Sequence, residues 1–471
     1  MTLLPAGWRD GEIAVIGLAK SGTGAAALLA REGARVYASD IGQPDTLEAI
    51  AAELRILGVE VETGRHDLER IARAKLVVAS PGVPPGAPPL VAARDAGVTV
   101  VSELEVALQL LPDTRIIAIT GTNGKTTTTA LVGHLLRSLG VSAIDAGNIG
   151  TPLSEVALHD HPSWIALEMS SFQLHDTPGI DPTVGVVTNL SPDHLDRYSG
   201  VEDYYADKAL LFRNASPRSS WVLNADDDAV LNLAVLGSAT SGYRERTQPT
   251  PGKTHLFSLE NRDCDAYYDR DRGALVVFGE VLLEREDLAL FGDHNVANAL
   301  AASLAVMVAD PDYATMEART RIAAGLRSFR ALKHRLEVAG EYAGVLWIND
   351  SKATNVSSTL VAIQGMTRPT ILLLGGRHKG EPYSALAEPF RRMGKRVLAY
   401  GEAAPIIEAD LGALVSVERL GSTFSEVIAR ASEIAESGDV ILLSPACSSY
   451  DMFRNYEERG ADFKRLAAGA P

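Results

Sequence analysis

A glycine-rich segment between a predicted strand and a predicted helix could bind phosphate. It reads Thr-Gly-Thr-Asn-Gly-Lys-Thr-Thr over residues 120–127 and follows the apolar run at 115–119. The backbone N–H groups of such a turn and the dipole of the following helix bind phosphate groups. Lys125 would then reach the β- and γ-phosphates of ATP, and the Thr126 hydroxyl would coordinate Mg²⁺. The spacing is a variant, because Ile119 occupies the place of the first glycine of the common motif. The ATP-binding residues predicted from this loop are Gly121, Thr122, Asn123, Gly124, Lys125, Thr126 and Thr127.

A second glycine turn lies near the N-terminus. Residues 17–22 read Gly-Leu-Ala-Lys-Ser-Gly and connect a predicted strand to a predicted helix. The turn is an imperfect dinucleotide fingerprint, because Ala19 replaces the second glycine. Lys20 and Ser21 offer contacts to a phosphate, but a turn without a ligand is an equally good interpretation. Asp40 follows the next strand, at a place where an acidic residue often contacts ribose.

Two segments of the middle region carry ionisable residues where strands end. Glu168 follows the apolar run at 165–167, and a carboxylate there can hold Mg²⁺, which prefers oxygen ligands. His194 lies in a polar segment, 188–197, that follows another apolar run. Loops at such strand ends often carry functional groups. His194 is therefore a candidate metal or substrate ligand, although a loop histidine often has neither role.

Lys208 lies in a predicted helical stretch, 204–212, next to Ala209 and Leu210. A lysine in this pattern ordinarily extends its ammonium group to solvent. The residue pattern alone therefore predicts a surface lysine.

The last third of the chain has two loops rich in cations and hydroxyls. Residues 349–355 include Asp350 and Lys352, and residues 374–380 include Lys379. With Arg335 just upstream, these loops offer several cations to an anionic ligand, or they are solvated loops.

A separate helix start, His294-Asn295-Val296-Ala297-Asn298, places asparagines on one face. They either bind a nucleotide or cap the helix.

Alternating short apolar runs and helical stretches position these groups. Such alternation predicts parallel sheets built from βαβ units. We expect three α/β domains, at residues 1–103, 104–331 and 332–471. A stretch of short alternating strands, about 242–287, predicts an antiparallel excursion. The strands expected in the rest of the chain are 13–16, 34–38, 76–79, 115–119, 165–167, 184–187, 221–223, 344–348, 370–374, 397–400 and 439–443.

The composition excludes some classes of protein. The chain has 471 residues and a formal net charge of −16, which argues against non-specific binding to nucleic acid or to anionic lipid. No run of about 18 uncharged apolar residues occurs, so no membrane span is expected. The N-terminus lacks a signal peptide pattern. Cys264 and Cys447, the two cysteines, are expected to be free thiols. We expect a cytoplasmic protein, most simply a monomer.

Taken together, these segments resemble the Mur ligases, and most closely the members that add D-glutamate. The phosphate loop, the helix start at 294–298 and the loop at 349–352 look like the core of that superfamily. Residues 167–174 and 193–198 are more typical of the D-glutamate-adding members, and residues 444–460 are similar too. The resemblance covers the whole chain. It implies an N-terminal Rossmann-like domain for a UDP-sugar, a central P-loop-type ATPase domain and a C-terminal Rossmann-like domain.

The resemblance implies an ATP-dependent amide ligation. ATP would phosphorylate the carboxylate of UDP-N-acetylmuramoyl-L-alanine, the amine of D-glutamate would attack the acyl phosphate, and phosphate would leave. ATP and two Mg²⁺ ions are the implied cofactors. The nearest alternatives are an L-alanine-adding ligase and a ligase like folylpolyglutamate synthase. A nicotinamide dehydrogenase and an inactive nucleotide-binding regulator are more distant alternatives.

The resemblance also implies a role for individual residues. The catalytic residues would be Lys125, His194 and Lys208. The metal ligands would be Thr126, Glu168, His194 and Lys208 after carbamylation. Further nucleotide-binding residues would be Asn298, Arg335 and Asp350. The UDP-sugar would contact Lys20, Ser21 and Asn148. D-glutamate would contact Lys352, Thr354, Lys379, Ser449, Tyr450 and Tyr456.

Overall fold

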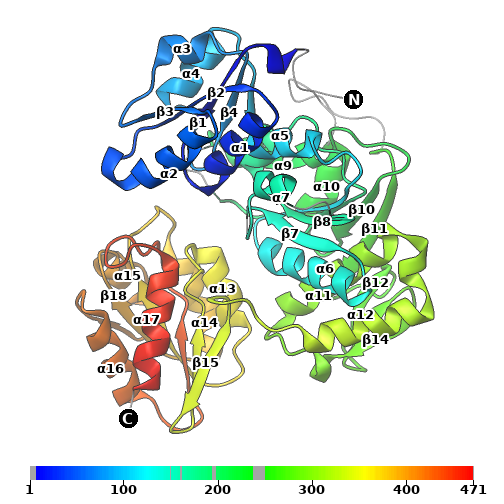
Figure 1. Cartoon of the computed structure of the whole chain (residues 1–471). Coiled ribbons are helices and arrows are strands. Elements are labelled where there is room, and N and C mark those ends of the chain that lie inside the picture. The colour runs from blue at the N-terminus through cyan, green and yellow to red at the C-terminus, as the bar shows by residue number, and fades with distance from the viewer. Residues whose placement is uncertain (1–6, 149, 160–161, 194–197, 237–249, 470–471) are drawn as a thin grey trace. The chain divides into compact units, whose positions relative to one another are not determined.

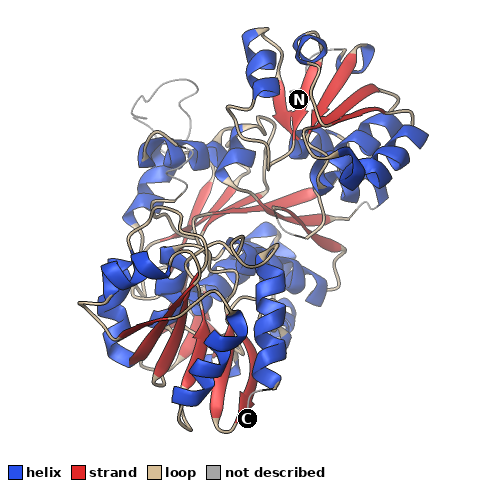
Figure 2. Ribbon diagram, turned by 90° about the vertical axis from the view of Figure 1, so that its left-hand side faces the viewer, coloured by secondary structure: helices blue, strands red, loops and turns tan. Residues whose placement is uncertain are grey.

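The computed structural model describes residues 7–148, 150–159, 162–193, 198–236 and 250–469. These residues form three β-sheets of five, nine and six strands (Figures 1 and 2). The chain divides into two compact units, Met1–Glu284 with Asn298–Leu326 and Arg285–Ala297 with Arg327–Pro471. The first unit holds the five- and nine-stranded sheets, and the second holds the six-stranded sheet. The α/β class is confirmed, and the exact domain boundaries stay a prediction.

The first sheet is parallel throughout and has the order β3-β2-β1-β4-β5. Its central strands are apolar and buried, as expected for a sheet with helices on both faces. The strand order reverses between β1 and β4, where ligands bind in sheets of this kind. Its elements are β1 (Glu12–Ile16), α1 (Lys20–Arg31), β2 (Arg35–Asp40), α2 (Pro44–Ile56), β3 (Glu60–Thr63), α3 (Leu68–Ala72), β4 (Leu76–Ala79), α4 (Pro88–Asp95), β5 (Val100–Ser102) and α5 (Glu103–Gln109).

Helix α1 begins two residues earlier than the sequence pattern indicated. Lys20 and Ser21 therefore lie in its first turn rather than in the preceding loop. A Cβ atom on Gly22 would lie 1.8 Å from the Gly17 carbonyl oxygen, so only glycine lets the helix start this close to β1.

The second sheet has the order β14-β13-β12-β11-β10-β9-β6-β8-β7. Strands β12 to β14 are antiparallel, which confirms the antiparallel excursion for that part. The prediction is wrong for β11, which runs parallel to β10 and β12. The strands are β6 (Arg115–Thr120), β7 (Ala143–Gly147), β8 (Trp164–Glu168), β9 (Val184–Val187), β10 (Ser220–Asn224), β11 (Lys253–Ser258), β12 (Ala266–Asp269), β13 (Ala274–Val277) and β14 (Glu280–Glu284).

The helices of this region join the first two sheets into one core. Leu28 and Leu29 of α1 belong to the same buried cluster as Leu153 and Val156 of α7. The helices are α6 (Lys125–Ser138), α7 (Leu153–His159), α8 (Ser171–His175), α9 (Val201–Ala209), α10 (Asp228–Leu236), α11 (Asp293–Ala309) and α12 (Met316–Ser328). The shared core holds the first two sheets in one compact unit.

The third sheet has the order β15-β16-β20-β17-β18-β19, and only the β15–β16 pair among its described strands is antiparallel. Leu372 and Leu374 of β17 pack into one buried cluster, and Ile371 and Leu373 pack into another. The sheet is therefore covered on both faces. Its elements are β15 (Glu337–Tyr342), β16 (Val345–Asn349), α13 (Val356–Gln364), β17 (Thr370–Gly375), α14 (Ala387–Met393), β18 (Gly394–Tyr400), α15 (Ala404–Leu411), β19 (Val417–Arg419), α16 (Phe424–Ile434), β20 (Val440–Leu443) and α17 (Tyr456–Ala468).

Two expectations drawn from composition can be compared with the described residues. Cys264 and Cys447 are buried free thiols, as predicted. Within the described ranges, every helix is too short or too polar to cross a lipid bilayer.

Candidate active site

The phosphate loop lies between β6 and α6, as the sequence predicted. Gly124 precedes the first residue of α6 and has a φ of 80°, in the left-handed region that favours glycine. Gly121 has a φ of 142°, and a Cβ atom there would lie 2.0 Å from Thr188 Oγ1. The loop therefore needs glycine at both positions, once for its turn and once for its close approach to the end of β9.

Residues at the end of β9 hold this loop in place. The Asn189 side chain accepts a hydrogen bond from Asn123 N at 2.8 Å and donates one to Asn123 O at 3.0 Å. Thr188 Oγ1 donates to the same carbonyl at 2.6 Å. The sequence analysis assigned no role to Thr188 or Asn189. Their position could have indicated a role at the site, because they directly follow β9, a strand that pairs in parallel with β6, and ligands bind at the carboxyl ends of such strands.

Two lysines meet at the phosphate loop. Lys125 Nζ donates to the carbonyl oxygens of Gly121 at 2.9 Å and Thr122 at 2.6 Å. Lys208 Nζ, from α9, also donates to Gly121 O, at 2.7 Å. The ammonium groups of two lysines thus share one carbonyl oxygen.

Lys208 is only 1% exposed, so the expectation of a surface lysine is wrong. Its helix packs this side chain toward the phosphate loop instead of toward solvent. Burial lowers the pKa of Lys208 well below its ordinary value, and the nearby charge of Lys125 lowers it further. Neighbouring carboxylates oppose this shift. Lys208 therefore has a larger neutral fraction than a solvent-exposed lysine.

Glu168 is the last residue of β8, the strand paired with β6. It is 1% exposed, and its Oε1 accepts a hydrogen bond from Asn148 Nδ2 at 2.9 Å. Its buried Oε2 has no hydrogen-bond partner among the described residues. A buried carboxylate oxygen without a partner is costly, and a bound cation removes that cost. Thr126, in the first turn of α6, is also buried. These oxygen atoms fit a Mg²⁺ ion.

His194 lies outside the described residues. Among the residues that are described, no three His, Cys, Asp or Glu side chains gather to form a metal site. A metal held here would therefore use Glu168 together with groups of other chemistry, such as the Thr126 hydroxyl.

Asn298 lies beside the phosphate loop, on α11. Its Oδ1 accepts a hydrogen bond from Thr128 Oγ1 at 3.2 Å. A Cβ atom on Gly124 would lie 2.4 Å from the same oxygen. The structure thus brings this predicted nucleotide-binding residue to the start of α6.

The predicted UDP-sugar residues surround one cavity of about 770 Å³. Lys20, Ser21 and Asn148 all line it, together with Asp40 and His66. A cavity of this size accommodates a small-molecule ligand. The sequence analysis assigned no role to His66.

The predicted D-glutamate residues lie in the second unit. Lys379 Nζ donates to Thr354 Oγ1 at 3.2 Å, and Lys352 Nζ lies 5.2 Å from the centroid of the Tyr456 ring. The two remaining residues differ in exposure: Ser449 is buried, whereas Tyr450 is 64% exposed. Two lysines and a hydroxyl near the carboxyl ends of β16 and β17 can bind carboxylates.

Asp350, a predicted nucleotide-binding residue, is buried at the end of β16. It accepts hydrogen bonds from Ser444 Oγ at 2.8 Å and from Leu336 N at 3.2 Å. Burial raises the pKa of Asp350 to about 7, and Arg335 is among the groups that oppose this rise. The carboxyl group is therefore partly protonated near neutral pH.

The shift at Asp350 predicts a pH-dependent stability. Because the folded-state pKa lies above the unfolded one, the protonated carboxyl stabilises the fold below about pH 4, and this contribution is lost as the pH rises to about 7. The Asp350→Asn variant cannot ionise at this position. We therefore expect the melting temperature of the variant, relative to that of wild type, to increase as the pH rises from 4 to 8. Thermal unfolding at several pH values measures this. Asp271→Asn is the control, because the Asp271 side chain is exposed. A difference in melting temperature between Asp350→Asn and wild type that does not change with pH would contradict the prediction.

Arg459, on α17, has a structural role that was not predicted from the sequence. Its guanidinium is fully buried and donates to the carbonyl oxygens of Ser351, Gly375 and Cys447 at 2.8–3.4 Å. It also donates to Ser351 Oγ at 2.9 Å. One side chain therefore connects the loops that follow three neighbouring strands.

We expect Arg459→Met to destabilise the protein strongly. The change leaves several buried carbonyl groups unpaired, which should cost about 3–5 kcal/mol. Denaturant unfolding, followed by fluorescence, measures the loss. The control is Arg454→Met, because the Arg454 side chain is 88% exposed and pairs with Glu458 at the surface. Equal stability of the two variants would show that the buried network contributes little.

Comparisons with known proteins identify the family. Residues 11–102 match the Mur ligase MurD-like N-terminal domain, residues 119–306 the Mur ligase middle domain, and residues 334–447 the Mur ligase glutamate ligase domain. Among solved structures, UDP-N-acetylmuramate-alanine ligase from Thermotoga maritima superposes with a TM-score of 0.61 at 19% identity. That superposition covers 98% of this chain and 100% of the other, and it shows that the folds are alike.

Curated relatives extend the match over nearly the whole chain. The proteins from Anaeromyxobacter dehalogenans and Myxococcus xanthus, both called UDP-N-acetylmuramoylalanine--D-glutamate ligase, are 41% and 40% identical to it. The alignments cover 97% of both chains in the first case and 99% of both in the second. The chain, with its phosphate loop and its three β-sheets in an α/β fold, therefore belongs to the Mur ligase family.

Proposed function

We propose that this protein is an ATP-dependent ligase that joins the amine of D-glutamate to the carboxylate of UDP-N-acetylmuramoyl-L-alanine. The observation that carries the proposal is the 41% identity, over 97% of both chains, to a ligase of that name. A carboxylate does not react with an amine until it gains a leaving group. Transfer of the γ-phosphoryl group of ATP makes an acyl phosphate, the amine attacks its carbonyl carbon, and phosphate leaves.

The phosphate loop supplies the charge stabilisation that phosphoryl transfer needs. Negative charge develops on the phosphate oxygens in this reaction, and positioned cations and N–H groups stabilise it. Lys125 is the cation of the loop, and residues 121–127 supply its backbone N–H groups. Asn298, on α11 and hydrogen-bonded to Thr128 of α6, is proposed as a further contact to the nucleotide. Arg335 and Asp350 are proposed as further nucleotide-binding residues.

Glu168 and Thr126 would hold a Mg²⁺ ion, which neutralises phosphate charge when bound. The unpaired buried Oε2 of Glu168 supports this assignment. His194, outside the described residues, is proposed as a ligand of a second ion or as a contact to the acyl phosphate.

Lys208 is proposed to carry a carbamate. In that modification the neutral amine attacks the carbon of CO₂, a C–N bond forms, and one proton is released. The product is an anion that can bind Mg²⁺. Burial and a lowered pKa support the proposal, because only the neutral amine reacts with CO₂.

Substrate binding is proposed for two further groups of residues. Lys20, Ser21 and Asn148, which line one cavity, would contact the UDP-sugar. Lys352, Thr354, Lys379, Ser449, Tyr450 and Tyr456 would contact D-glutamate, whose two carboxylates need cations and hydroxyls. We further propose a cytoplasmic monomer, which size-exclusion chromatography with light scattering tests.

ADP release tests the function directly. Purified protein is mixed with ATP, Mg²⁺ and UDP-N-acetylmuramoyl-L-alanine, and D-glutamate, L-glutamate or L-alanine is added singly. A parallel set contains UDP-N-acetylmuramate. We expect turnover only with the alanylated sugar and D-glutamate. Turnover only with UDP-N-acetylmuramate and L-alanine would assign the enzyme to the preceding reaction, and no turnover in any mixture would contradict the proposal.

A further inference from the structure

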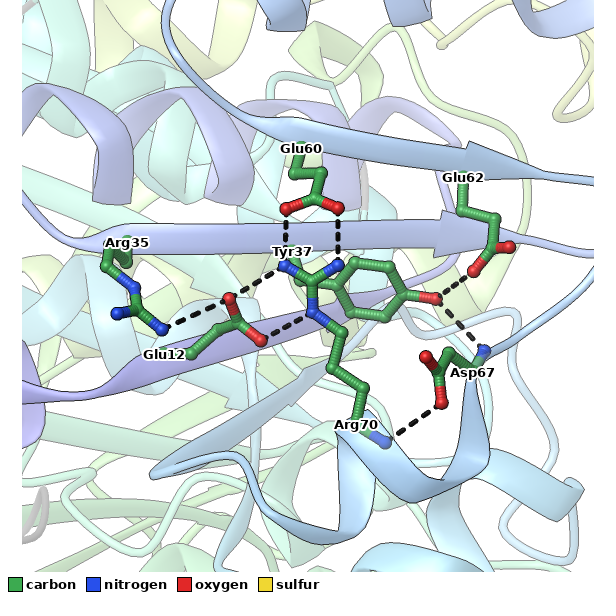
Figure 3. Close-up of polar contacts among 7 residues, drawn as sticks. All are labelled: Glu12, Arg35, Tyr37, Glu60, Glu62, Asp67 and Arg70. Carbon is green, nitrogen blue, oxygen red and sulfur yellow. Dashed lines mark hydrogen bonds and ion pairs between the residues drawn. The ribbon is translucent and has the colours of Figure 1, made fainter.

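Arg70 joins three strands of the first sheet through a group of polar side chains (Figure 3). Its guanidinium donates to Glu12 at 2.6 and 2.8 Å and to both oxygens of Glu60 at 2.5 Å. The same guanidinium lies 4.3 Å from the centroid of the Tyr37 ring, in a cation–π contact. Arg70 therefore holds the starts of β1 and β3 against the side chain of Tyr37 on β2.

The Tyr37 hydroxyl in turn holds the loop between β3 and α3. It donates to Glu62 Oε2 at 2.6 Å and accepts from the backbone N of Asp67 at 3.0 Å (Figure 3). At the other end of the loop, Gly64 N donates to the Asp40 carbonyl oxygen at 2.8 Å. This short loop is thus tied to β2 at both ends.

His66 lies between these two attachments. Its Nδ1 is 2.9 Å from the Oγ of Ser39, a fully buried residue of β2. His66 also lines the cavity of about 770 Å³ that Lys20 and Ser21 share. With Nδ1 engaged, Nε2 is the ring atom that remains to bond a ligand. Burial lowers the pKa of His66, which favours the neutral imidazole, although Asp40 and Glu62 oppose the shift.

Asp40 also lines this end of the cavity, and its ionised carboxylate can only accept hydrogen bonds. An acidic residue at the end of the second strand often binds ribose in sheets of this kind. Here both carboxylate oxygens already accept backbone hydrogen bonds, from Leu18 N at 2.6 Å and from Gly42 N at 2.7 Å. The acceptor atoms of a nucleoside bound beside β2 need a donor, which a carboxylate cannot supply, and the imidazole of His66 lies next to Ser39 of β2.

We infer that His66 contacts the uridine part of the UDP-sugar and that Tyr37 is a positioning residue that holds the His66 loop. This inference rests on the proposed function, because it takes the cavity to be the UDP-sugar site. The diphosphate would lie nearer to Lys20 and the start of α1, whose backbone N–H groups favour anions.

Calorimetric titration of the full chain tests the role of His66. The probes are UDP, UMP and inorganic pyrophosphate, and ATP is titrated as a control. We expect His66→Ala to weaken UDP and UMP binding about tenfold, the effect of one hydrogen bond, and to leave pyrophosphate and ATP unchanged. Unchanged UMP binding would overturn the inference. Equal weakening of UDP and pyrophosphate, with UMP unaffected, would place His66 at the diphosphate and overturn it as well.

Steady-state kinetics test the role of Tyr37. We expect Tyr37→Phe to raise KM for the UDP-sugar several-fold, with kcat and KM for ATP unchanged. Combining it with His66→Ala should add no further increase, because both changes remove the same contact. Glu60→Gln is the matched control, since it weakens the Arg70 network away from the loop and should lower the melting temperature but not raise KM. An equal increase in KM for Glu60→Gln, or an additive double variant, would contradict a positioning role.

Different results would contradict the proposed function and the inference about His66. If wild type turns over with D-glutamate while His66→Ala binds UMP normally, the function stands and the inference is wrong. If wild type binds neither UDP nor UMP and shows no turnover, the proposed function fails and the inference fails with it.

Discussion

Lys125→Ala should abolish ligation while leaving the fold intact. The side chain bonds two carbonyl oxygens of the phosphate loop at 2.6–2.9 Å and supplies the loop's cation. Loss of a positioned charge that stabilises a transition state costs about 10²–10³-fold in kcat, and we expect the upper end here because a phosphoryl group is transferred. ADP release and thermal unfolding are measured on the same preparation.

A surface lysine provides the control for this variant. Lys253 is exposed at the start of β11, and Lys253→Ala should retain wild-type turnover. Near-normal turnover of Lys125→Ala would refute the role assigned to the loop. Loss of turnover together with a collapsed melting temperature would instead indicate a folding defect, and Lys125→Met, which keeps the apolar stem, would then separate the two causes.

Lys208→Ala should lose activity and regain part of it with a short carboxylate. The carbamate proposal requires an anion at this position, and removing a metal-binding anion should lower kcat by about 10²-fold or more. Acetate or formate can occupy the vacated space and restore a carboxylate. Turnover is measured with and without the added anion.

Lys208→Arg and isotopic labelling strengthen this test. Arginine keeps a positive charge but does not form a carbamate, so we expect it to be as inactive as alanine. Wild-type protein equilibrated with ¹³C-bicarbonate should show a carbamate carbon resonance that Lys208→Ala lacks. Full activity of unsupplemented Lys208→Ala, or identical spectra of the two proteins, would eliminate the carbamate.

The strands that sequence reasoning missed are all edge strands. Strands β3, β5, β7, β15 and β19 each lie at the end of a sheet in the order of the described strands. An edge strand has a neighbour on one side only and is often partly exposed, so it lacks the continuous apolar run of a central strand. Strand β15 shows this, because none of its residues is fully buried. The central strands outside the stretch 242–287 contain apolar runs and were predicted within a few residues.

Patterns in the sequence were enough to predict the phosphate loop, the α/β class and the family resemblance. These rest on local spacing: a strand, a glycine turn and a helix start are contiguous in the chain, so their geometry follows from the residues alone. The comparisons confirm the family and fold.

Contacts between residues that are distant in the chain became visible in the three-dimensional fold and could not be predicted from local patterns. The residue pattern around Lys208 predicts a surface lysine, but the side chain is buried. It bonds the carbonyl oxygen of Gly121, which lies 87 residues earlier in the chain. His66 was not among the predicted site residues, and Arg459 was included only as part of the similar segment 444–460, with no role of its own. Their environments come from strand ends that parallel pairing brings to one edge of a sheet, and the order of strands in a sheet is set by packing of the whole chain rather than by local propensity.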